Sequence, residues 1–161
     1  MGWVTLTLRK TELKRTHSDY QKQLLDISRT KRRMARESHY QQLLVRNDQQ
    51  EALRGIRNDY LALRDSYNEQ LNDPNLSDSE KANIRTQLEQ ALEERTFNEN
   101  EIKAMYEADL TMLEDNANDE ETMLDQEQVQ IEAQLEAIKA ELDAVGEAIS
   151  SQIQDSTIKL S

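Results

Sequence analysis

The 161-residue chain contains no cysteine, one proline and three glycines, and aromatic residues make up only 4% of it. The lack of cysteine excludes a disulfide scaffold, a thiol nucleophile and any site in which thiolates hold zinc or an iron–sulfur cluster. So little proline and glycine excludes a turn-rich β-sandwich and a glycine-rich phosphate loop. No apolar run approaches the ~18 residues of a membrane span, so the sequence predicts none.

The chain is instead rich in charge, with 32 Asp and Glu and 20 Lys and Arg residues against a hydrophobic fraction of 36%. This apolar content is low for an ordinary globular core. The commonest residues are Leu, Arg, Gln, Glu, Lys and Ala, which all favour helix. The composition therefore predicts an all-α, elongated protein that forms a single domain over residues 1–161.

Apolar residues recur at helical spacing between residues 10 and 71, which predicts one long helix over that range. From Leu53 to Tyr67 they alternate steps of three and four residues, as in the seam of a coiled coil. The apolar positions are Leu13, Tyr20, Leu24, Ile27 and Met34, followed by Leu53, Ile56, Tyr60, Leu63 and Tyr67.

A turn is predicted at residues 72–77. Pro74 has no amide hydrogen and restricts Asp73, so the first helix ends there. Ser77 followed by Glu80 forms a capping-box pattern, which starts a second helix at residue 78. That helix is expected to run to residue 155. Residues 114–121 are poor in helix formers, and the sequence leaves open whether they break it.

Both ends of the chain read as short extended, β-like tips, over residues 1–9 and 156–161. Polar and apolar residues alternate there, and many are β-branched, which is typical of strands. The N-terminal order of residues also differs from that of a secretory signal. We therefore expect cytoplasmic synthesis without a signal peptide. Leaderless export to the cell surface or exterior, or incorporation in a virus-like particle, stays open.

Charge is divided unevenly along the chain. Residues 1–60 carry 13 Lys and Arg and 7 Asp and Glu, whereas residues 61–161 carry 7 and 25. If the chain folds back at the turn, positions whose numbers add up to about 149 lie opposite each other. A basic cluster then faces an acidic one and sets the register of an antiparallel hairpin. The two clusters are Arg29, Lys31, Arg32, Arg33 and Arg36, and Glu114, Asp115, Asp119 and Glu120.

In such a hairpin the second helix would extend past the first by about 16 residues and leave apolar side chains uncovered. The extended tips or a neighbouring copy could cover them, the tips by β-addition. The residues expected to make these contacts are Trp3, Val4, Leu6, Leu8, Val145, Ile149, Ile153, Ile158 and Leu160.

No motif indicates catalysis or a cofactor. The two histidines, His17 and His39, lack the partners of a zinc or di-iron site. A thin hairpin also has no pocket that could separate the pKa values of two carboxyl groups. The sequence therefore predicts no enzyme, no metal or cofactor and no small-molecule substrate. The acidic net charge argues against a nucleic-acid partner.

These observations predict a long antiparallel helical hairpin, packed as a coiled coil, that associates with copies of itself. The first functional hypothesis is a structural subunit of a homopolymeric assembly such as a filament, sheath, needle or particle. The alternative is an adaptor, scaffold or assembly chaperone that binds another protein as a discrete oligomer. A weaker third hypothesis is a nucleic-acid-associated coiled coil that acts through its basic arm.

Overall fold

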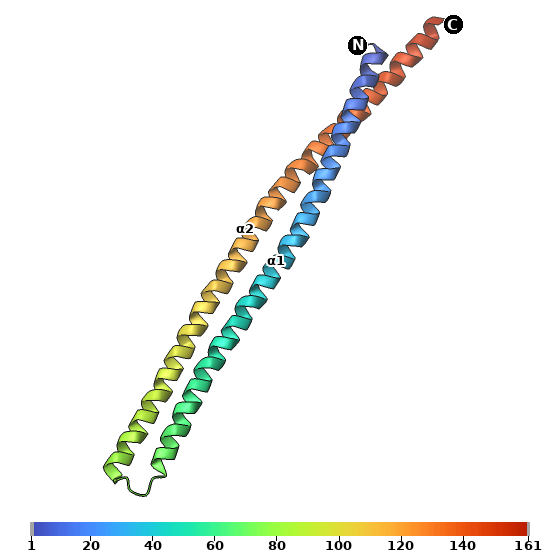
Figure 1. Ribbon diagram of the computed structural model, residues 1–161. Helices are drawn as coiled ribbons and strands as arrows, with labels where there is room; N and C mark the ends of the chain where they lie inside the picture. Colours follow the sequence, from blue (N-terminus) through green and yellow to red (C-terminus); the bar gives the residue numbers. More distant parts are fainter. Residues whose placement is uncertain (1, 161) are drawn as a thin grey trace. The chain divides into compact units, whose positions relative to one another are not determined.

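The computed structural model describes the backbone of residues 2–160 and the side chains of residues 2–157. It contains two α-helices, α1 (Trp3–Leu71) and α2 (Asp78–Leu160), which pack against each other. Within the described residues there is no strand. The predicted all-α fold with two long helices is therefore confirmed (Figure 1).

The turn between the helices is held by short-range hydrogen bonds. The amide of Asn75 donates to the Asp73 side chain over 3.0 Å, and the amide of Glu80 donates to Ser77 Oγ over 3.2 Å. The second of these bonds is the first half of the predicted capping box. Asp78 and Glu80 add negative charge to the first turn of α2, where the helix dipole favours it.

The predicted extended tips are wrong: residues 3–8 belong to α1 and residues 156–160 to α2. Adding a turn to an existing helix is less costly than starting a separate strand that has no partner. The threonine hydroxyl groups find acceptors within the helix: Thr7 donates to the carbonyl of Trp3, and Thr11 donates to that of Thr7. Alternation of polar and apolar residues was thus a misleading signal.

Helix α2 also continues through residues 114–121. These residues, poor in helix formers, therefore do not break the helix. The chain nevertheless divides into two compact units at this point. The first unit joins the start of α1, up to Arg36, with the end of α2, from Ala117 onward; the second unit is Glu37–Asn116.

The first unit contains every residue that is buried among the described side chains. Leu6, Leu13 and Val145 form one cluster, with exposed fractions of 7%, 4% and 9%, and Ile138, Leu142 and Ile149 pack around it. Ile27 and Ile131 are buried further along the same two helices. The helices are antiparallel, and both termini lie at the same end of this unit (Figure 1). The first turns of α1 thereby cover α2 as far as Ile149, whereas Ile153 further along α2 is 53% exposed.

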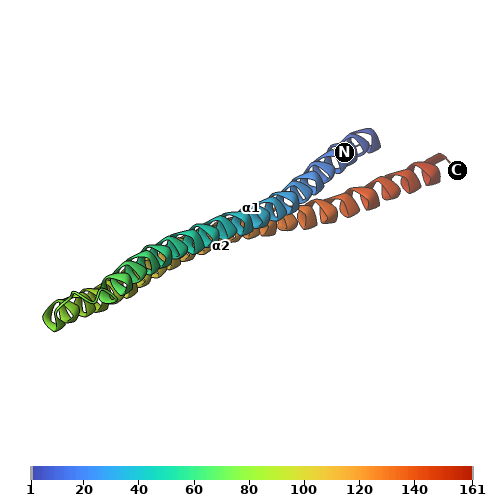
Figure 2. The same cartoon turned by 60° about the horizontal axis from the view of Figure 1, so that its bottom comes forward.

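The second unit is a helical hairpin, with the end of α1 and the start of α2 side by side next to the turn (Figures 1 and 2). None of its residues is buried. The positions of α1 and α2 that face each other there, such as Ile56, Tyr60 and Leu88, stay partly exposed. Two helices alone therefore leave the apolar surface of this unit incompletely covered.

Candidate interaction surfaces

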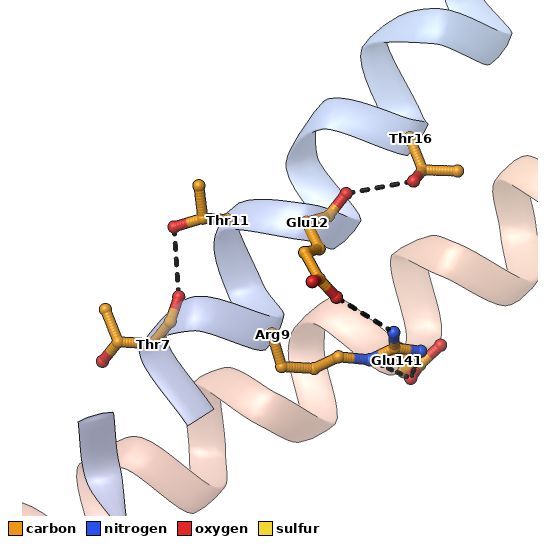
Figure 3. A network of polar contacts seen from close by, with 6 residues as sticks. All are labelled: Thr7, Arg9, Thr11, Glu12, Thr16 and Glu141. Atoms are coloured by element: carbon orange, nitrogen blue, oxygen red, sulfur yellow. Dashed lines mark hydrogen bonds and ion pairs between the residues drawn. The ribbon is translucent and has the colours of Figure 1, made fainter. Parts of the chain in front are cut away.

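In the first unit, Arg9 joins the two helices near their ends. Its Nη2 atom donates to Glu141 Oε1 over 2.7 Å, and its Nη1 atom lies 3.5 Å from Glu12 (Figure 3). The hydrogen bond that Arg9 donates to the Glu141 carboxylate is the main cause that raises the pKa of the Arg9 guanidinium. Because both side chains of the Arg9–Glu141 pair are nearly half exposed, the pair adds little stability.

Lys31 makes the second contact between the helices of this unit. Its Nζ atom donates to Asp125 and, over 2.8 Å, to Gln128 Oε1. Gln128 in turn donates to Glu132 over 2.9 Å. Gln128 thus helps to hold the partly buried lysine. Among the described side chains, no further ion pair links α1 with α2.

The contacts follow the predicted register near the ends of the helices and depart from it further in. Arg9 and Glu141 have numbers that add up to 150, close to the predicted sum of about 149. Lys31 would face position 118, but its partners are Asp125 and Gln128, about two helical turns further along α2. Asp119 and Glu120 lie in the same unit as the basic cluster, whereas Glu114 and Asp115 belong to the second unit. Buried apolar contacts set this register, since exposed ion pairs are individually weak.

Most of the basic cluster faces water. Arg29, Arg32, Arg33 and Arg36 are exposed, and only Lys31 is partly buried. None of the four arginines has an ion pair within the described part of the chain. These charges are therefore available to a partner.

The predicted terminal contacts divide into two groups. Leu6, Val145 and Ile149 pack within the first unit. The exposed group consists of Trp3, Val4, Leu8 and Ile153, each more than half accessible. The side chains of Ile158 and Leu160 lie outside the described residues.

One regular feature escaped the sequence interpretation. Arg15, Lys22, Arg29 and Arg36 recur at every seventh residue and are all exposed. Seven residues are close to two helical turns, so they lie along one line of α1. The buried residues Leu6, Leu13 and Ile27 are also separated by multiples of seven. Arg15 and Arg29 each come two positions after one of them, about 200° around the helix. We call these four residues the basic stripe.

The outward side of α2 in the same unit carries the opposite charge. Glu132, Glu136, Asp143 and Glu147 are exposed and recur after four, seven and four residues, which keeps them on one side of the helix. Small side chains, Ala133 and Ala140 among them, lie between these acids. We call the four acids the acidic face. Lys139 is the one basic residue among them.

The two helical segments of the first unit differ in total charge in the same way as the basic stripe and the acidic face. Residues 1–36 carry ten Lys and Arg and three Asp and Glu, whereas residues 117–161 carry two and eleven. The two helical segments are therefore oppositely charged along their length.

The second unit has a polar group where its helices face each other. The Arg95 guanidinium lies 4.9 Å from the centre of the Tyr60 ring, and its Nε atom donates to Glu99 over 2.9 Å. This hydrogen bond, opposed in part by desolvation, lowers the pKa of Glu99. Arg57 and Lys103 border the same glutamate and lower its pKa further.

Exposed apolar residues follow α2 in this unit. Phe97, Met105 and Met112 are each more than half exposed. Spacings of eight and seven residues place them on one side of the helix.

The described residues contain neither a membrane-spanning helix nor a cluster of metal ligands. Neither helix has a stretch apolar enough to cross a membrane, and no three His, Asp or Glu side chains come together as metal ligands would. Comparison of the chain with models of protein families, with curated proteins and with solved structures finds no match.

Proposed function

We propose that this protein is a non-enzymatic structural subunit that assembles with copies of itself into a homopolymer through coiled-coil packing of its helices. The observation that carries the proposal is the incomplete burial of its apolar side chains. Five large apolar residues are buried, while fifteen of those described are exposed. Some of the exposed residues gather on one side of a helix, as Phe97, Met105 and Met112 do on α2, and such apolar patches are typical of protein–protein contact surfaces.

The distribution of the buried residues supports the same proposal. All five lie in the first unit, and the second unit has none. Because two helices bury only one strip of each other's surface, stable helical proteins of this kind usually pack three or four helices around a core. A second copy would supply the missing helices.

The charge distribution favours repeated assembly over a closed pair. In the first unit the basic and the acidic surfaces lie on different helices and face outward on different sides, so a contact that joins the basic surface of one copy to the acidic surface of the next is heterologous. Such contacts form rings or open filaments, whereas a two-fold dimer uses the same surface on both copies.

The test is the dependence of particle size on concentration. Mass photometry and light scattering of the purified chain should show growth beyond a dimer or tetramer as concentration rises, and negative-stain microscopy should show extended or ring-shaped particles. A fixed dimer or tetramer at every concentration would overturn the proposal. That result would favour the alternative, a coiled-coil adaptor, scaffold or assembly chaperone for another protein.

A further inference from the structure

We propose that the basic stripe on α1 of one copy docks against the acidic face on α2 of a neighbouring copy. This inference rests on the proposed self-assembly and specifies the surface that performs it. The basic stripe has no ion pair among the described side chains, and of the acidic face only Glu132 is engaged, by Gln128 of its own helix. Both surfaces therefore retain their charge for a second copy.

The residues of the two surfaces lie at matching levels along the unit. The contacts Arg9–Glu141 and Lys31–Asp125 mark two levels of the antiparallel pair. Counted from Arg9–Glu141, Arg15 lies level with residue 135 and Lys22 with residue 128; counted from Lys31–Asp125, they lie level with residues 141 and 134. Glu136 and Glu132 fall within these two ranges. A neighbour displaced sideways without any shift along the helices would thus bring each of these basic residues to an acidic one.

An apolar pair lies at the border of the same surfaces. Leu25 is 51% exposed and comes three residues after Lys22, beside the basic stripe. Val129 is 63% exposed and comes seven residues before Glu136, on the side of the acidic face. Both lie within about two turns of the Lys31–Gln128 contact, so the same sideways displacement brings them together.

Small residues on α2 suit long basic side chains. Ala133 and Ala140 leave space between the acids, and the methylene stems of Arg and Lys can cover such surface while their charged ends reach the carboxylates. Lys139 does not fit this pattern and should weaken the contact locally.

The basic stripe and the acidic face lie on the outward sides of their helices, away from the helix that each one packs against. A copy that uses its basic stripe with one neighbour keeps its acidic face for another. The contact therefore repeats, which is the behaviour of a polymer.

The test reverses charge on each surface separately. Arg15→Glu/Lys22→Glu/Arg29→Glu should raise the concentration needed for assembly by about tenfold or more, because the two attractive pairs of Arg15 and Lys22 become repulsive and the stripe loses its positive charge. Glu132→Lys/Glu136→Lys/Asp143→Lys should do the same. An equimolar mixture of the two variants should assemble again, since each supplies the surface that the other needs. Circular dichroism should show that both remain helical.

A matched control reverses three exposed basic residues of the second unit, Arg46→Glu/Arg64→Glu/Arg85→Glu, and changes the net charge by the same amount. This variant should assemble like the unchanged chain. If the unchanged chain assembles and the mixture does not, the docking surface is wrong while the proposed function stands. If the unchanged chain never grows, the proposed function fails and this inference with it.

A nucleic-acid partner for the basic stripe is a separate outcome. A short DNA duplex added at physiological salt should not bind the chain. Binding that is lost in the Arg15/Lys22/Arg29 variant, with assembly unaffected, would overturn the proposal.

Discussion

Replacement of Leu13 by Ala tests the packing of the first unit most directly. Leu13 is only 4% exposed and lies in the cluster with Leu6 and Val145. The change removes three carbons, which at about 0.8 kcal/mol for each buried methylene amounts to ~2.4 kcal/mol. A small cavity contribution brings the expected loss to about 2.5–3 kcal/mol.

Leu8→Ala is the matched control, because Leu8 is on the same helix but 63% exposed. With roughly a third of the burial, it should lose less than about 1 kcal/mol. Ala and Leu differ little in helix propensity, so that contribution is small and common to both variants.

Urea unfolding, followed by circular dichroism and by the fluorescence of Trp3, gives the measurement. With a slope of about 3 kcal/mol per molar urea, the midpoint should fall by about 1 M for Leu13→Ala and by less than about 0.3 M for Leu8→Ala. Equal midpoints for the two variants would refute the assignment of Leu13 to the core and of Leu8 to the surface.

Three further predictions concern the start of α1, the hydrogen bond between Arg95 and Glu99, and Gly55. Because the chain has no cysteine, single thiols can be compared cleanly: Leu6→Cys should react with a maleimide several times more slowly than Leu8→Cys. Hydrogen bonding to Arg95 lowers the pKa of Glu99, so this glutamate stabilises the fold above the ordinary carboxyl pKa and loses that effect as pH falls through its lowered value. Glu99→Gln should therefore cost about 0.5 kcal/mol of unfolding free energy at pH 7, measured with urea, and less in acid. Gly55→Ala should raise the unfolding free energy by about 0.5–1 kcal/mol, since no atom lies within 4 Å of the added Cβ.

Each of these has a contrary result. Equal reaction rates of the two thiols would indicate an extended N-terminal segment after all. An effect of Glu99→Gln that does not change with pH would mean that its carboxylate charge is unimportant. Loss of stability in Gly55→Ala would show that this position is not an open helical site.

The helices and the turn could be predicted because their signals are local. Favourable helix formers fill both segments, and Pro74 interrupts the backbone hydrogen bonding at one point. The N-terminal segment could not be predicted in the same way. Leu6 belongs both to a strand-like alternation with Leu8 and to the seven-residue spacing that leads to Leu13, and only its contact with Val145 decides between them.

The predicted register fits the contact between Arg9 and Glu141 but not that between Lys31 and Asp125. A register that is predicted from charge clusters alone leaves out the apolar contacts. These contacts contribute more free energy than exposed ion pairs do. Lys31 illustrates this, because its long side chain meets Asp125 rather than the predicted acids. The basic stripe, in contrast, was visible in the sequence: the interval of seven residues from Arg15 to Arg36 is regular and could have been read directly.

The position of the best-packed residues has a consequence for how the protein is made. Arg9 and Glu141, which are in contact, lie 132 residues apart in the chain. At a synthesis rate of ~5–20 residues per second, the start of α1 leaves the ribosome roughly 7–26 s before its partner exists. During that interval Leu6 and Leu13 have nothing to cover them. The nascent protein must therefore tolerate an open apolar strip, and its final closure is a late event in biosynthesis.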